Sequence, residues 1–259
     1  HLGIHAQKEE GLSYVGVLSH VVQTFSRRPL MSYPLMVLAL LATGFLSFGL
    51  WVHHMYTTGI SPVPLGFFAA VGAVVAIPSG VNVFGWIATI WAGKPVWRTP
   101  MLYAIASIIV FTIGGVTGVM VAAVPFDFQA HDTYFVVAHL HYVLFGGTVF
   151  PIFAAIYFWF PKMSGKMPSE RLGWWSAAIM FVGFNVAFFP MHLSGLQGMP
   201  RRLYTYHPGL GLDLYNLIST IGAFLFAFGV VLSLFNFFKS VREGEEAGHD
   251  PWQGDTLEW

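Results

Sequence analysis

The stretch HDTYFVVAHLH, residues 131–141, joins a polar cluster of metal-binding residue types to a hydrophobic segment of the kind that crosses a membrane. An imidazole buried in an apolar helix costs free energy unless it has a partner. A second histidine pair, His53 and His54, ends an earlier apolar run, and an arginine pair, Arg201 and Arg202, ends a later one. We expect these places to lie at one level of one membrane and to hold redox metals.

The composition is that of an integral membrane protein. Of 259 residues, 56% are hydrophobic, 17% are aromatic and only 9% are charged, whereas a soluble domain is about 25% charged. The formal net charge is zero, which gives no indication of a nucleic-acid partner. The chain has no cysteine, so disulfides, iron–sulfur clusters and thiolate copper sites are excluded from it. Any metal here must use histidine, carboxylate or backbone oxygen.

The fold class predicted is all-α and polytopic, with about six full transmembrane helices and one partial helix. A spanning helix needs about 20 apolar residues, and the charge-free intervals show where such helices fit. We expect a divergent polar segment at 1–11, a transmembrane domain at 12–239 and a cytoplasmic polar tail at 240–259. The helices expected are approximately 12–25 (partial), 34–56, 65–91, 99–124, 133–160, 172–196 and 212–238.

The basic residues predict the orientation, because they collect in cytoplasmic loops. If the helices alternate across the bilayer, one side holds Arg27, Arg28, Lys94, Arg98, Lys162, Lys166, Arg171, Lys239 and Arg242. That side is expected to be cytoplasmic. Arg201 and Arg202 are then the only basic residues on the outer side, so an anionic partner is expected for them.

The histidine spacings predict two kinds of site. His139 and His141 are two apart, and such residues are rotated by about 200° on an α-helix. They should therefore face opposite sides and serve two different metal centres. His53 and His54 are about 100° apart, which allows one shared metal if the helix end is loosened. Neutral imidazole is a usual ligand for copper and haem iron.

Three motifs resemble the haem–copper oxidase subunit I family, most of all its cytochrome c oxidase members. They are WVHHMYT at 51–57, the stretch 131–142 and GMPRR at 198–202. The resemblance runs from about Ser19 to the carboxyl end. It implies the last part of helix VI through helix XII of a twelve-helix bundle.

The resemblance also implies roles for single residues. His53 and His54 would bind the copper CuB, His139 would bind the iron of haem a3, and His141 would bind the iron of haem a. His53, His54 and His139 would be the catalytic set. His131 and Asp132 would bind magnesium, and Arg201 and Arg202 would pair with haem propionates.

The function implied is that of a terminal oxidase in an aerobic respiratory chain, reducing O2 to water with electrons from cytochrome c and coupled proton uptake or translocation. The implied partners are the amino-terminal half of subunit I, oxidase subunit II with its CuA centre, subunit III, cytochrome c and membrane lipid. The implied location is a bacterial plasma membrane. Alone, this chain is expected to be incomplete and inactive.

Two departures from the family pattern keep other interpretations open. The family's His-Pro-Glu-Val-Tyr motif would fall at residues 4–8 and is absent there. A proton route implied by the resemblance would use Ser19, Ser79 and Asn82, but Asn82 stands where the family has lysine. The alternatives are a catalytically silent or truncated haem-binding paralogue, a quinol-oxidising member of the superfamily and, more remotely, a histidine-lined transporter.

Each site residue also has an ordinary structural explanation. His139 and His141 could be satisfied core histidines, and His53 and His54 a wet interfacial pair. Asp132 could cap the following helix. Other such roles are snorkelling to lipid headgroups for the arginines and helix packing for Ser19, Ser79 and Asn82. No role is assigned to His20, His192, His207 or His249.

Overall fold

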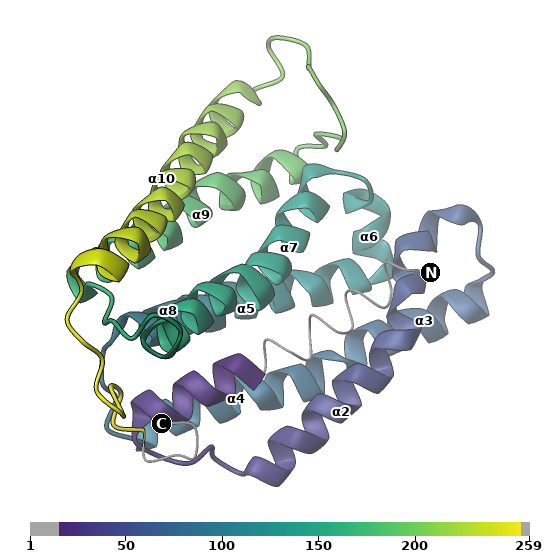
Figure 1. The fold of residues 1–259 in the computed structure, drawn as a ribbon. Helices are drawn as coiled ribbons and strands as arrows, with labels where there is room; N and C mark the ends of the chain where they lie inside the picture. Colours follow the sequence, from purple (N-terminus) through teal and green to yellow (C-terminus); the bar gives the residue numbers. More distant parts are fainter. Residues whose placement is uncertain (1–15, 255–259) are drawn as a thin grey trace.

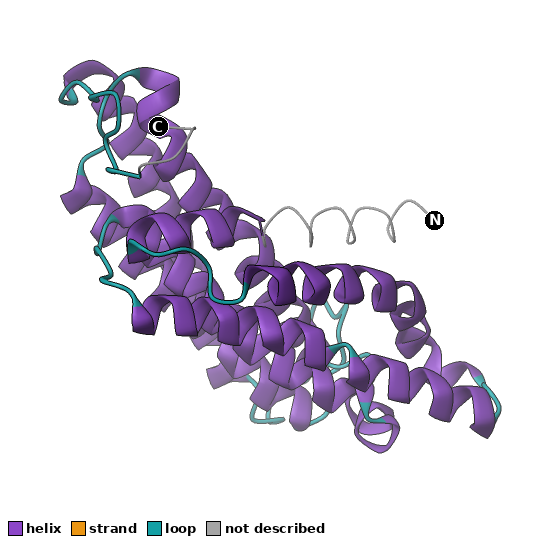
Figure 2. Cartoon of the chain, turned by 90° about the horizontal axis from the view of Figure 1, so that it is seen from below, coloured by secondary structure: helices purple, strands orange, loops and turns teal. Residues whose placement is uncertain are grey.

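The structure, a computed structural model, describes residues 16–254. These residues form helices joined by loops (Figure 2). Six helical segments are long and apolar enough to cross a membrane, namely Tyr33–Thr58, Pro62–Ala92, Thr99–Ala122, Tyr134–Ser164, Glu170–Leu196 and Asp213–Glu243. The all-α polytopic fold is confirmed, and the chain is an integral membrane protein.

Several of these spans are built from more than one helical element. After a helix at 16–26, the elements are α2 (Tyr33–Leu50), the 3-10 helix η1 (Trp51–Thr58), α3 (Pro62–Val74), α4 (Ala76–Ala92), α5 (Thr99–Ala122), α6 (Val124–Ala130), α7 (Tyr134–Leu144), the π-helical η2 (Phe145–Val149), α8 (Phe150–Ser164), α9 (Glu170–Leu196) and α10 (Asp213–Glu243). The predicted segment 1–11 and the motif position at 4–8 lie outside the described residues.

The span predicted as one helix at 65–91 is interrupted. It begins earlier, at Pro62, and changes from α3 to α4 at Val75. Pro78 explains the break, because proline has no N–H to donate and its ring clashes with the carbonyl four residues earlier, which belongs to Val74. Hydropathy cannot detect such a break, since the sequence stays apolar through it.

The span predicted at 133–160 has a similar irregularity. The π-helical turn η2 separates α7 from α8, and Pro151 lies in the first turn of α8. The missing N–H of Pro151 leaves the carbonyl of Gly147 without its usual helical donor. π-helical turns often accompany functional sites, and this one directly follows the two histidines of α7.

The helices pack both with neighbours in sequence and with more distant helices (Figure 1). α9 lies beside α10 and α7, α5 lies beside α7 and α8, and α2 lies beside α4. The approach of α7 to α9 is so close that a Cβ at Gly195 would collide with the backbone of Phe135. This packing holds the histidines of α7 between α5 and α9.

The carboxyl-terminal segment predicted as a polar tail packs against the bundle. α10 continues to Glu243, and Trp252 beyond it is 2% exposed. The Trp252 indole Nε1 donates to the Phe158 carbonyl oxygen at 2.8 Å. The indole ring packs edge-on against the Phe25 ring. The segment therefore covers one end of the helix bundle instead of extending freely.

Candidate functional site

The first part of the site is the histidine pair in η1. His53 and His54 are partly buried, and their Nε2 atoms are 2.9 Å apart. Both histidines lie in the 3-10 helix η1, which has a tighter turn than an α-helix, and not at a loosened helix end. The distance between the Nε2 atoms is that of a hydrogen bond between the two rings, and two nitrogens bound to one ion at about 2.0 Å in a tetrahedral site lie about 3.3 Å apart. The two Nε2 atoms therefore converge on one place, with a spacing slightly shorter than that of two tetrahedral ligands.

His139 faces α5. Its Nδ1 lies 3.0 Å from the Gly114 carbonyl oxygen and 3.1 Å from the Thr117 hydroxyl. A carbonyl oxygen only accepts, so Nδ1 carries the proton and Nε2 keeps its lone pair. Gly118 leaves room for the ring, because a Cβ there would lie 3.0 Å from His139 Cε1. α5 thus orients His139 in the tautomer that a metal ligand requires.

His141 faces α9. Its Nδ1 lies 2.7 Å from the Val137 carbonyl oxygen, which again places the proton on Nδ1 and the lone pair on Nε2. The ring stacks on Phe188 with centroids 4.3 Å apart and planes at 16°. His139 and His141 therefore point to different neighbouring helices, as their spacing predicts, and they cannot hold the same ion.

The loop before α7 is tied to the loop after α9. Tyr134 N donates to the Met199 carbonyl oxygen at 2.9 Å, and Arg201 N donates to the Asp132 carbonyl oxygen at 2.8 Å. The Arg201 guanidinium forms an ion pair with the Asp132 carboxylate. His54 lies within electrostatic range of Arg201, His131 and Asp132. The structure thus brings the η1 histidines and both loops into one region.

The ordinary explanation of Asp132 as a helix cap fails in this region. The residue that caps α7 is Thr133, whose hydroxyl accepts from Phe135 N at 3.3 Å, so Asp132 is not the cap. The two arginines differ in their surroundings. Arg201 is 23% exposed and paired, and its Nε is buried without a hydrogen-bond partner. Arg202 is exposed and has a left-handed backbone.

Asp127 of α6 supports His131. Asp127 is 4% exposed, and its Oδ2 lies 3.0 Å from His131 Nδ1. Burial raises the pKa of the Asp127 carboxyl above its ordinary value, and the hydrogen bond from His131 opposes that rise. Asp127 was not among the predicted site residues, although an acid four residues before a histidine at a helix end is a recognisable pair.

The three proton-route residues lie around α4. Trp86 Nε1 donates to the Ser19 hydroxyl at 3.0 Å. Asn82 is 4% exposed and its Nδ2 donates to the Pro78 carbonyl oxygen at 3.2 Å, while its Oδ1 is buried without a partner. Ser79 and Asn82 are three residues apart and therefore share a helix face.

The sequence profile of the family described as cytochrome c and quinol oxidase polypeptide I matches residues 12–225. The chain belongs to this haem–copper oxidase subunit I family. The predicted resemblance is therefore confirmed at the level of the family.

Relatives of this subunit I chain include both kinds of oxidase. It is 51% identical over 245 residues to cytochrome c oxidase subunit 1 of Bacillus subtilis (strain 168), covering 94% of this chain and 39% of that protein. It is 45% identical over 246 residues to quinol oxidase subunit 1 of the same strain, with 94% and 38% covered. The chain thus spans about 40% of the length of these relatives.

The fold also matches a solved haem–copper terminal oxidase dimer. The TM-score is 0.77 at 21% identity, and the match covers 90% of this chain and 46% of that one. At this identity the likeness shows the fold alone. The shared fold therefore extends over about half of that chain.

The residues present fit the cofactors of the subunit I family to different degrees. The family binds haem and copper, and the η1 pair and the two α7 histidines present free or convergent Nε2 atoms suited to them. Within residues 16–254, no group of three histidine, aspartate or glutamate side chains could hold a metal ion. His131 contacts Asp127, and Asp132 pairs with Arg201, so both residues proposed for magnesium have protein partners in this structure.

One buried histidine of the subunit I chain was missed from the sequence. His192 of α9 is 6% exposed, its Nε2 has no hydrogen-bond partner, and its ring contacts Phe135 and Tyr142 of α7. It also lies within electrostatic range of His139. No local pattern marked it, because it stands alone in an apolar helix.

Proposed function

We propose that this chain provides the carboxyl-terminal, haem- and copper-binding part of a terminal oxidase that reduces O2 to water with electrons from cytochrome c. The observation that carries this proposal is the pair His139 and His141. Each holds its Nδ1 proton against a carbonyl oxygen and keeps the Nε2 lone pair, and the two rings face different helices. Within the subunit I family, two haems on opposite sides of α7 account for this arrangement.

The proposed ligands divide among three centres. His139 binds the iron of haem a3, His141 binds the iron of haem a, and His53 with His54 binds CuB. When bound, these groups supply the electron transfers to oxygen. The contribution of the chain is to fix the rings, because Thr117 and Gly114 hold His139 while Phe188 holds the ring plane of His141.

Arg201 and Arg202 are proposed to pair with haem propionates. The buried Nε of Arg201 has no partner, which leaves a donor available for an anionic group. The Asp132 carboxylate already balances part of the Arg201 charge, so the Arg201 guanidinium would lie between Asp132 and a propionate. Arg202, exposed and without that ion pair, would approach a propionate from the surface.

Two further assignments rest on the resemblance. Magnesium at His131 and Asp132 stays a prediction, and no step of the proposed function depends on it. Ser19, Ser79 and Asn82 are proposed to border a proton route, and the unpartnered Oδ1 of Asn82 supports a water molecule there. Asparagine holds such a water but cannot carry a protonic charge itself.

The proposed working unit is larger than this chain. The other half of subunit I would supply the third copper ligand and the second ligand of haem a. Subunit II with CuA, subunit III and cytochrome c would complete the electron route in a bacterial plasma membrane. Identity does not distinguish the donors, because quinol oxidase subunit 1 at 45% falls within the 44–51% of the cytochrome c oxidase subunits. Cytochrome c is proposed from the resemblance of residues 131–142.

Oxygen uptake tests the proposal. The chain is produced together with an amino-terminal half of subunit I and its partner subunits, and uptake is measured with reduced cytochrome c and then with a quinol. Uptake with cytochrome c that disappears in a His53→Ala, His54→Ala double variant is expected. Background uptake by a preparation that binds haem would point to a silent paralogue, and uptake with quinol alone would point to the quinol-oxidising alternative.

A further inference from the structure

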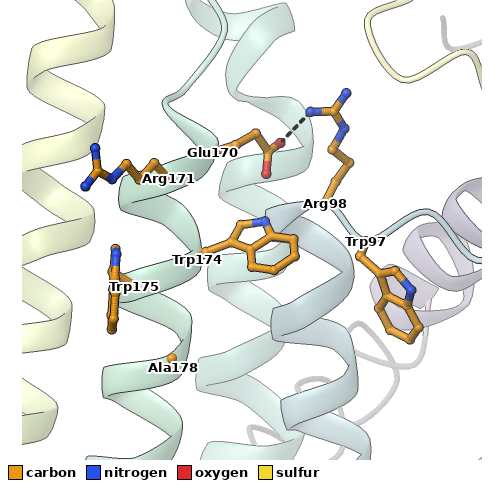
Figure 3. A pocket seen from close by; sticks show the side chains of 7 residues that line it. All are labelled: Trp97, Arg98, Glu170, Arg171, Trp174, Trp175 and Ala178. Atoms are coloured by element: carbon orange, nitrogen blue, oxygen red, sulfur yellow. Dashed lines mark ion pairs between the residues drawn. The ribbon is translucent and has the colours of Figure 1, made fainter.

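A cleft of about 600 Å3 lies between the start of α5 and the start of α9, away from the histidines. Its lining consists of Trp97, Arg98, Glu170, Arg171, Trp174, Trp175 and Ala178 (Figure 3). This volume is within the range of clefts that bind small molecules. The cleft is at the end of the bundle where the alternating topology collects most of the basic residues.

The lining residues on α9 are ordered by chemistry along the helix. Arg171, Trp174, Trp175 and Ala178 follow a spacing of three, four and seven residues and therefore share one face. At 1.5 Å per residue, Trp174 lies about 4.5 Å and Ala178 about 10.5 Å deeper than Arg171. With increasing depth, this face presents a cation, then two indoles, then a small apolar side chain. A phospholipid presents its phosphate, its glycerol esters and its acyl chains in the same order.

The arginines of the cleft are available to an anion. Arg98 is 52% exposed, and its Nη1 lies 3.9 Å from Glu170 Oε1, which leaves other guanidinium donors uncommitted. Arg171 is exposed and makes no hydrogen bond or ion pair with any residue at 16–254. In Figure 3 the two arginines extend on either side of the Trp174 indole.

Glu170, the acidic residue in the lining of the cleft, is engaged by Thr99 and by Arg98. Glu170 Oε2 accepts from Thr99 N at 2.9 Å and from the Thr99 hydroxyl at 2.8 Å, so it caps the first turn of α5. Its Oε1 is buried. The carboxylate therefore caps α5 and offsets part of the Arg98 charge. With two arginines and one carboxylate in its lining, the cleft keeps an excess of positive charge.

Exposed indoles border the same cleft. Trp97 is 47% exposed, Trp174 is 46% exposed and Trp175 is 59% exposed. Tryptophan is enriched where the bilayer meets water, and basic clefts between transmembrane helices on the cytoplasmic side bind anionic headgroups. We propose that this cleft binds one anionic phospholipid of the adjoining leaflet, with its phosphate at the level of Arg98 and Arg171 and an acyl chain along Trp174, Trp175 and Ala178.

Native mass spectrometry tests this proposal on the chain purified from its membrane with the subunits that stay attached. After delipidation, the protein is titrated with dioleoyl phosphatidylglycerol or with dioleoyl phosphatidylcholine, which differ only in the headgroup. We expect one tight phosphatidylglycerol site, at least tenfold weaker phosphatidylcholine binding at that site, and no competition by millimolar inorganic phosphate. Each arginine near the surface contributes enough to change the affinity about fivefold.

Matched variants assign the site. Arg171→Gln should weaken phosphatidylglycerol binding about fivefold, and Arg98→Lys, which keeps the charge beside Glu170, should weaken it less. Trp174→Leu should weaken both lipids. The controls are Arg242→Gln, an exposed basic residue at the same end but outside the cleft, and Trp91→Leu, an indole that is 88% exposed outside the cleft.

Several results would overturn the proposal. Equal affinity for both lipids would show an apolar groove without headgroup recognition, and displacement by inorganic phosphate would show a site for a free anion. A loss of binding in Arg242→Gln as large as in Arg171→Gln would show a general charge effect. An attached subunit that covers Trp174 and blocks both lipids would show a protein interface.

Discussion

His139 is the residue on which the proposed oxygen-reducing centre depends, and Thr117 is the side chain that holds it. Thr117→Val keeps the shape of the side chain but removes the hydroxyl 3.1 Å from His139 Nδ1. Loss of such a supporting contact weakens metal binding by about 10–100-fold. Because the Gly114 carbonyl remains, we expect the lower value, about tenfold faster loss of haem to apomyoglobin.

Thr112→Val is the control for that measurement. Thr112 lies on the same helix and bonds only to the Ile108 carbonyl oxygen, at 2.6 Å. Equal haem loss from the two variants would contradict the role given to Thr117, since a general weakening of α5 would then be sufficient.

Gly118 tests whether the His139 ring needs the space beside α5. In Gly118→Ala the new Cβ would lie 3.0 Å from His139 Cε1, whereas Gly115→Ala on the same helix would meet nothing within 4 Å. We expect the first variant to tilt the ring and shift the absorption band of high-spin haem, and the second to leave that band unchanged. If the absorption band shifted in neither variant, the His139 ring would have more room beside α5 than the structure shows.

At the scale of elements, a buried polar network joins four helices away from the histidines. The Tyr103 hydroxyl on α5 contacts Ser176 of α9 at 2.9 Å and Ser233 of α10 at 3.0 Å. Asn236 of α10 donates to the Tyr157 hydroxyl of α8 at 3.2 Å and to the Ser169 carbonyl oxygen at 2.9 Å. These contacts tie α10 to the helices that contain the site.

Asn236→Ala should therefore destabilise the bundle. Hydrogen bonds between membrane helices contribute about 0.6 kcal/mol each on average. The variant removes the two bonds that Asn236 donates and the two that its Oδ1 accepts, while Tyr157 and Ser169 keep other partners. We expect a loss of about 1–2 kcal/mol in the free energy of unfolding by sodium dodecyl sulfate. Thr220→Ala, an exposed position on α10, should change it by less than about 0.5 kcal/mol, and an equal loss there would be contrary to this account.

The elements also show what the sequence could predict. Hydropathy is sufficient to find the spans, because each one is long and has its charged residues only near its ends. It does not find the irregularities at Val75 and at Phe145–Val149, although Pro78 and Pro151 mark them through their missing N–H groups. The contacts of His139 with Gly114 and Thr117 come from a different helix, and no local pattern in the sequence predicts them.

At the scale of the whole molecule, the basic residues predict which side each loop faces. The chain has no cysteine, so single cysteines report topology without interference. Tyr204 is 100% exposed and Glu245 is exposed at the other end. In intact cells, a maleimide that cannot cross membranes should label Tyr204→Cys and should label Glu245→Cys only after lysis. The reverse pattern would contradict the proposed orientation.

The central claim is that α7 presents two haem ligands on opposite sides, and a reduced-minus-oxidised optical spectrum tests it most directly. The assembled oxidase containing this chain is compared with His139→Ala, His141→Ala and the exposed control His207→Ala. We predict two haem components, with the high-spin one lost in His139→Ala, the low-spin one lost in His141→Ala and both kept in His207→Ala. The absence of haem from every preparation, or loss of the same component in both α7 variants, would contradict the account.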